Sequence, residues 1–98
     1  MAVLAVTSST ARVPVGPYWM QTFRVTTGAA SAVEYFVTGF SNVITVVGDA
    51  ILGITAGAGT SNYILNAQAT SGTAGDYPGD LAIETTAGFD MEVTVLGQ

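Results

Sequence analysis

Several residue types that carry common protein chemistry are missing from this sequence. The 98 residues include no cysteine, histidine or lysine, and Arg12 and Arg24 are the only basic side chains. These absences exclude a disulfide scaffold, a zinc site built on cysteine or histidine, a Ser-His or cysteine nucleophile, a Schiff-base lysine and a Walker phosphate loop. We therefore predict a protein that is not an enzyme and that binds no cofactor.

Charge is also scarce. Charged residues make up 9% of the chain, whereas a soluble domain usually has about 25%, and the net charge is -5. Two cations cannot neutralise a phosphate backbone, so we expect no nucleic-acid partner. A surface with so few charges is expected to be covered in large part by neighbouring molecules.

No segment has the pattern of a membrane span or a secretory leader. Residues 50–75 are uncharged but interrupted by glycine, serine and asparagine, so they do not form about 20 consecutive apolar residues. Residues 1–11 place no positive charge ahead of their short apolar stretch, so we interpret Met1 as an ordinary cytosolic start.

The positive signal is a series of short β-type runs bounded by turn residues. They cover residues 2–7, 18–27, 33–38, 43–47, 50–56, 63–70, 81–86 and 91–96. The pattern predicts an all-β fold, a small antiparallel β-sandwich or barrel of about seven to eight short strands. Residues 1–17 are expected to form an extended N-terminal arm and residues 18–98 a single β domain.

Two turns and two apolar runs refine this prediction. Gly48 and Asp49 fit a two-residue type II′ hairpin, and residues 87–90 fit a hairpin between the last two strands. The runs 35–37 and 43–47 are apolar on both faces and need cover on both, which favours a homo-oligomer. Edge strands without lysine would also need covering.

Partner contacts are predicted where aromatic, methionine and aliphatic residues gather. For Trp19 two interpretations stay open, a core position or a partly exposed anchor. The candidate interface residues are Val3, Leu4, Val6, Tyr18, Trp19, Met20, Phe36 and Phe40. Arg24 is expected to pair with a carboxylate on a neighbouring strand or subunit, or else to be solvated.

The acidic residues allow two further hypotheses. Glu84 with Glu92, or Asp76 with Asp80, would be the carboxylate pair of a minimal glycoside hydrolase. Residues 75–80 would alternatively bind calcium, and Tyr63, Tyr77, Asp76 and Asp80 would serve a calcium- or carbohydrate-binding module of adhesin type. The simpler interpretation is that aspartate and glycine form turns here.

Residues 37–46 (VTGFSNVITV) and 91–98 (MEVTVLGQ) carry a resemblance, together with the Thr/Val/Gly/Ala-rich, nearly uncharged composition. The chain resembles the small all-β virion proteins of tailed bacteriophages, and among them the head decoration, or cement, proteins. The resemblance implies a protein made in the host cytoplasm that binds the major capsid protein on the outer surface of the head. It further implies a homo-oligomer, with a trimer favoured, whose N-terminal arm reaches a neighbour. It assigns no catalytic, cofactor or metal residue.

Overall fold

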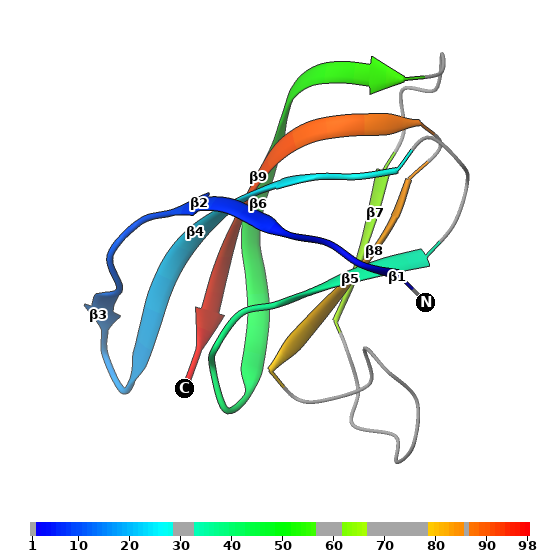
Figure 1. The fold of residues 1–98 in the computed structure, drawn as a ribbon. Coiled ribbons are helices and arrows are strands. Elements are labelled where there is room, and N and C mark those ends of the chain that lie inside the picture. Colours follow the sequence, from blue (N-terminus) through cyan, green and yellow to red (C-terminus); the bar gives the residue numbers. More distant parts are fainter. Residues whose placement is uncertain (1, 29–32, 57–61, 67–78, 86) are drawn as a thin grey trace.

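The computed structural model describes residues 2–28, 33–56, 62–66, 79–85 and 87–98. These residues form nine β-strands and no helix, which confirms the predicted all-β fold (Figure 1). The strands are β1 (Ala2–Val3), β2 (Val6–Ser9), β3 (Val13–Val15), β4 (Tyr18–Thr26), β5 (Val33–Val37), β6 (Val43–Ala56), β7 (Asn62–Asn66), β8 (Asp80–Thr85) and β9 (Gly88–Gly97).

The strands form the two sheets of a small β-sandwich. One sheet has the order β1-β5-β8-β7 and the other the order β2-β4-β9-β6, with β3 paired to β4 outside that path. All pairings are antiparallel except that of β1 with β5, which is parallel. Strand β9 lies inside the second sheet, where β6 pairs with it along its whole length and β4 pairs with its residues 90–97.

The core lies between the two sheets and follows from strand alternation. On β9, Met91, Val93 and Val95 are fully buried while the residues between them are half-buried, as the sequence pattern predicts. Phe23 of β4 and Phe36 of β5 meet across the core with ring centroids 5.3 Å apart. Both sheets therefore contribute to one hydrophobic cluster.

The N-terminal segment, predicted as an arm, forms strands of both sheets in this single chain. Val3 pairs with Tyr35 of β5, and the chain then crosses to the other sheet, where β2 pairs with β4. Leu4 lies at the crossing, where its backbone N–H donates to the carbonyl of Tyr35 and its side chain enters the core. This segment closes one side of the sandwich (Figure 1).

The predicted hairpin at Gly48 and Asp49 is wrong. Residues 43–56 form the single strand β6, whose 14 residues pair with the 10 residues of β9. The register shifts at four places, so that Ile44, Val47, Leu52 and Thr55 are extra residues without a partner on β9. Such β-bulges twist and bend a strand. Gly48 therefore lies inside a twisted and bent strand instead of in a turn.

The tight hairpin occurs instead between β3 and β4, at Gly16 and Pro17. Val15 pairs with Tyr18, which leaves these two residues as the connection. Gly16 has a φ of 58°, which favours glycine, and proline supplies the negative φ that the second position of a type II′ turn needs. The β3–β4 hairpin, defined as residues 13–20, therefore has a rigid turn.

The second predicted hairpin, between the last two strands, is also wrong, because β8 and β9 belong to different sheets. The chain crosses the sandwich there, beside a buried threonine. Thr27 Oγ1 donates to the carbonyl of Ala87 and accepts from the backbone N–H of Phe89. Thr85 Oγ1 adds a hydrogen bond to the same hydroxyl. These bonds hold the crossing chain against the end of β4.

Candidate interaction surfaces

The candidate interface residues separate into core and surface. Leu4, Phe36 and Phe40 are buried in the hydrophobic cluster, and Val6 packs partly buried against it. Their side chains stabilise the single chain and have little or no surface left for a partner. The apolar pattern around Phe36 and Phe40 in the sequence therefore indicates buried core positions.

The other candidates lie at the surface, and most belong to the β3–β4 hairpin. Trp19 is 44% exposed, and Tyr18 and Met20 are half-buried beside it. Val13 and Val15 of the facing strand are also exposed. Among the described strands β3 pairs with β4 alone, so the hairpin lies at an edge of its sheet (Figure 1). Of the two interpretations of Trp19, the partly exposed position is the one observed.

A second apolar surface lies on β6, and the sequence pattern indicates only part of it. Its exposed side chains, here called the β6 strip, are Val47, Ile51, Leu52 and Ile54. The pattern marks residues 43–47 as needing outside cover but not residues 51–54, which have the signature of an ordinary strand. Two of the four are bulge residues, and strand alternation gives no sign of a bulge.

The edge strands β1, β3 and β6 have features that oppose direct strand addition, whereas the edge strand β7 has none of these features. The edge strand β1 has two residues, β3 carries Pro14, which has no N–H, and β6 is interrupted by its four bulges. The expectation that edge strands without lysine need covering stays a prediction, and at these three strands the fold reduces that need. Contacts with other molecules at these places would use side chains.

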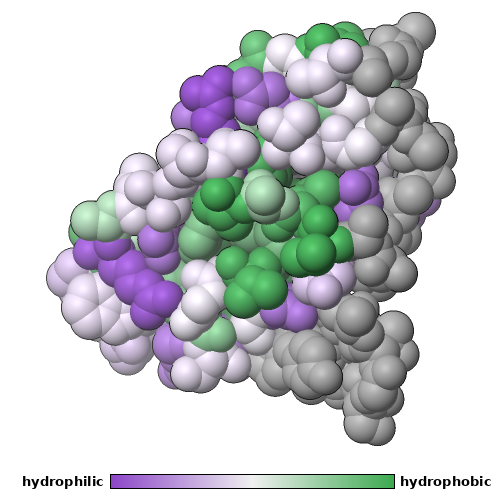
Figure 2. Space-filling view, viewed as in Figure 1, coloured by the Kyte–Doolittle hydropathy of each residue, from purple (hydrophilic) through white to green (hydrophobic). Residues whose placement is uncertain are grey.

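The face drawn in Figure 2 has hydrophobic residues gathered in its middle and hydrophilic residues toward its borders. Val3, on the outer side of β1, is 61% exposed, and Val37 at the end of β5 is 55% exposed. Scattered apolar residues are normal on a protein surface, whereas clusters indicate contact sites. The described segments that carry several exposed large hydrophobic residues are the hairpin and β6.

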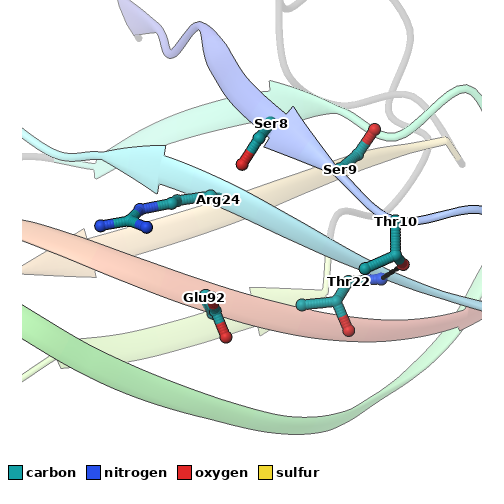
Figure 3. A pocket seen from close by; sticks show the side chains of 6 residues that line it. All are labelled: Ser8, Ser9, Thr10, Thr22, Arg24 and Glu92. Carbon is teal, nitrogen blue, oxygen red and sulfur yellow. Dashed lines mark hydrogen bonds between the residues drawn. The ribbon is translucent and has the colours of Figure 1, made fainter.

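A shallow polar groove of about 120 Å³ runs over β2, β4 and β9. Its lining is hydroxyl-rich and includes one charge of each sign: Ser8, Ser9, Thr10, Thr22, Arg24 and Glu92 (Figure 3). The hydroxyl of Thr10 already accepts from the backbone N–H of Thr22, and that of Thr22 bonds to Thr94. The groove therefore uses much of its hydrogen-bonding capacity within the chain.

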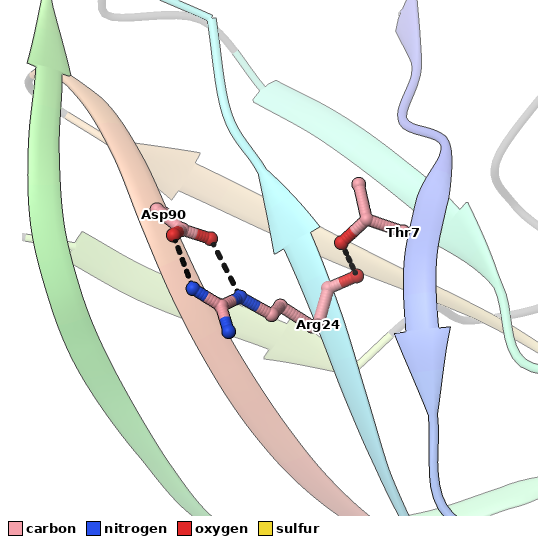
Figure 4. Close-up of polar contacts among 3 residues, drawn as sticks. All are labelled: Thr7, Arg24 and Asp90. Carbon is pink, nitrogen blue, oxygen red and sulfur yellow. Dashed lines mark hydrogen bonds and ion pairs between the residues drawn. The ribbon is translucent and has the colours of Figure 1, made fainter.

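Arg24 forms the cross-strand ion pair that the sequence indicates. Its Nε donates to Asp90 Oδ1 at 3.1 Å and its Nη2 to Oδ2 at 2.6 Å, while its backbone carbonyl accepts from Thr7 (Figure 4). This hydrogen-bonded arginine lowers the pKa of the Asp90 carboxyl below its ordinary value of 3.8. The same pairing raises the pKa of Arg24. The pair links β4 to β9 on the outer face of the sheet.

The acidic hypotheses find no assembled site in the described residues. Glu84 lies on β8 opposite Val33, whereas Glu92 lies on β9 opposite Arg24, so these two glutamates stand on different sheets and are not hairpin neighbours. Asp80 is buried at the start of β8. Asp76, Tyr77 and the side chain of Tyr63 lie outside what the structure describes. Within the described chain, no three acidic, cysteine or histidine residues group to hold a metal ion.

Comparisons with protein families, curated proteins and solved structures found no match to this chain. No helix in the described parts is long and apolar enough to cross a membrane.

Proposed function

We propose that this chain is a structural protein of a tailed-bacteriophage particle, a decoration or cement protein that binds the outer surface of the head. It would act as a homo-oligomer, preferably a trimer, and stabilise the shell through contacts with the major capsid protein. Its place is the surface of the virion, after synthesis in the host cytoplasm. The proposal combines the sequence resemblance with the character of the molecular surface.

One observation supports the proposal above all others. Nine large hydrophobic side chains of the described residues are exposed, while the chain has only two basic residues, one of which, Arg24, is paired with Asp90. Burying apolar area contributes about 25 cal/mol per Å² before the cost of association is subtracted. A chain with this surface is stabilised by permanent contact with other molecules. A protein fixed to a shell has such contacts throughout its life.

The test is co-sedimentation of the purified chain with phage heads that lack it. We expect saturable binding to the heads and an increase in the temperature at which they release their DNA. Because the contact is mainly apolar, 1 M NaCl should leave most of the chain bound. Release of most of the chain by salt, or no binding at all, would contradict the proposal.

The competing function is a calcium- or carbohydrate-binding module. Calorimetric titration of the same preparation with calcium and with a glycan panel separates the two. Heat of binding from either ligand, combined with no binding to heads, would replace the proposed function.

A further inference from the structure

The polar groove over β2, β4 and β9 contains a carboxylate that forms no ion pair within the described chain. Glu92 is half-buried on β9 and has neither a hydrogen bond nor a salt bridge to any described residue. Strand register places it in one row with Ser8 and Arg24, because Arg24 pairs with Ser8 on one side and with Glu92 on the other (Figure 3). The hydroxyls of Ser8 and Ser9, which also line the groove, likewise make no hydrogen bond to described residues. These groups are available to a ligand.

The basic side chains of the chain are both engaged elsewhere. Arg24 donates from Nε and Nη2 to Asp90, two residues from Glu92 on the same strand. The pairing with Asp90 raises the pKa of Arg24, and the nearby charge of Glu92 adds to this effect. Arg12, the only other basic residue, lies over the ring of Phe40. Two acids, Asp90 and Glu92, thus stand against one cation, Arg24, so this part of the surface has a net charge of -1.

The side of Glu92 that faces β6 is open. Ala50 of β6 pairs with Glu92, and Gly48 and Gly53 pair with the residues two positions away from it on β9. Ala50 is exposed, and no atom lies within 4 Å of the Cβ position of either glycine. A long side chain from another molecule can therefore lay its aliphatic part over these small residues and reach Glu92 with its charged end.

We propose that the polar groove binds an arginine side chain of a partner protein, whose guanidinium pairs with Glu92. A guanidinium presents N–H donors in a planar fork that matches a carboxylate, and its remaining donors match the serine hydroxyls. The net charge of -1 favours a cation over an anion. A sugar is disfavoured, because none of the described residues that line the groove is aromatic.

The inference deepens the proposed function and rests on it for the identity of the partner, which would be the major capsid protein. A partly exposed charge pair contributes little to affinity, so its effect is to fix the orientation of a contact that is mainly apolar. The expected resistance of head binding to salt is therefore unchanged.

The test is a proton–nitrogen correlation NMR titration of the full chain with Nα-acetyl-arginine amide, whose only charge is the guanidinium. We expect saturable shifts of the backbone amide signals of the residues that line the groove, among them Ser8, Arg24 and Glu92. Nα-acetyl-citrulline amide has nearly the same shape without the charge and should cause no saturable shift.

Three variants locate the binding site. Glu92→Gln should raise the dissociation constant of the arginine probe about three- to fivefold, near the upper end of the range for exposed charge pairs. Ala50→Leu fills the open side of Glu92 without a change of charge and should also weaken binding. Glu84→Gln is the matched control, because Glu84 is an exposed glutamate on the other sheet, and this variant should bind as the wild type does.

The NMR spectrum of each variant shows whether it folds, and the comparison of the two probes on the wild-type chain decides if one does not. No saturable binding of the arginine probe, equal binding of the citrulline probe, or unchanged binding in folded Glu92→Gln would overturn the inference, whatever the chain does with phage heads. A chain that binds the probe at Glu92 but ignores heads would overturn only the proposed function. If heads bind, Glu92→Gln should bind them more weakly than Glu84→Gln, and equal binding would overturn the assignment of the groove to a partner protein.

Discussion

The guanidinium carbon of Arg12 lies 4.1 Å from the centroid of the Phe40 ring. Arg12 belongs to the link between β2 and β3, and its Nε also donates to Gln21 Oε1 at 3.2 Å. Phe40 lies in the connection between β5 and β6, where its ring packs edge to face with Phe23. The arginine thus fixes the N-terminal segment over an aromatic ring of the core.

Arg12→Ala should therefore lower the free energy of unfolding by about 0.5–1 kcal/mol, the range for a cation over a ring at an exposed site. Urea denaturation measures the change. Arg12→Lys, which keeps the charge but not the planar group, should lose less. Equal stability of Arg12→Ala and the wild-type chain would mean that the stacking contributes nothing.

The ring of Phe40 also sets a limit on Gly97. A Cβ atom placed on Gly97 would overlap ring carbons of Phe40, so Gly97→Ala should force the ring or the end of β9 to move. We expect a loss of about 1–3 kcal/mol in stability, as for other overpacked sites. Gly48→Ala is the matched control, because no atom lies within 4 Å of the position that its Cβ would take; it should change stability by less than about 0.5 kcal/mol.

Phe36 and Val37 are neighbours on β5 with opposite environments. Phe36 is fully buried between the sheets and Val37 is exposed. Phe36→Ala should cost about 3–5 kcal/mol, because a large cavity forms in the core. Val37→Ala should have only a small effect on the unfolding temperature. The measurement uses a protein concentration that is too low for self-association. Comparable losses for both variants would contradict the assigned faces of β5.

The ion pair of Arg24 with Asp90 makes stability depend on pH. Because the folded chain holds the pKa of Asp90 below its ordinary value of 3.8, the stabilisation is present above that value and is lost as pH falls through the lowered pKa. Asp90→Asn should thus unfold at a lower temperature than the wild-type chain at neutral pH.

The gap between Asp90→Asn and the wild type should close in acid, below about pH 4. Calorimetric scans from neutral to strongly acidic pH measure this difference in unfolding temperature. Arg24→Met is the control: in a chain that already carries this substitution, Asp90→Asn should have little further effect. A gap that persists unchanged at the acidic end would show that the aspartate acts through packing.

Local pattern predicts most of the strands but not their partners. The alternation at Met91, Val93 and Val95 is sufficient to identify β9 and its buried face. The same signals cannot reveal that β8 and β9 belong to different sheets, because pairing depends on contacts between distant segments. Gly48 and Asp49 match a turn rule, yet pairing with β9 holds the chain extended there through bulges that no local rule predicts.

The interaction surfaces are predictable to a similar degree. Hydrophobicity marks Phe36 and Phe40 as strongly as Tyr18 and Trp19, but only the fold shows that the first two are buried. The exposed valines of β3 fall within the predicted arm, because the sequence pattern did not identify the turn that pairs them with β4. Burial is a property of the assembled sandwich, and residue type alone does not determine it.

The proposed role depends on neighbouring molecules covering the apolar exterior of this chain. Cryo-electron microscopy of phage particles that contain the chain shows directly which parts of its exterior are buried by neighbouring molecules. We expect density for the chain at symmetry-related positions on the outside of the head, with the β3–β4 hairpin buried against a neighbour. Particles whose outer surface carries no such density, together with a chain that stays monomeric in solution, would contradict the proposed role.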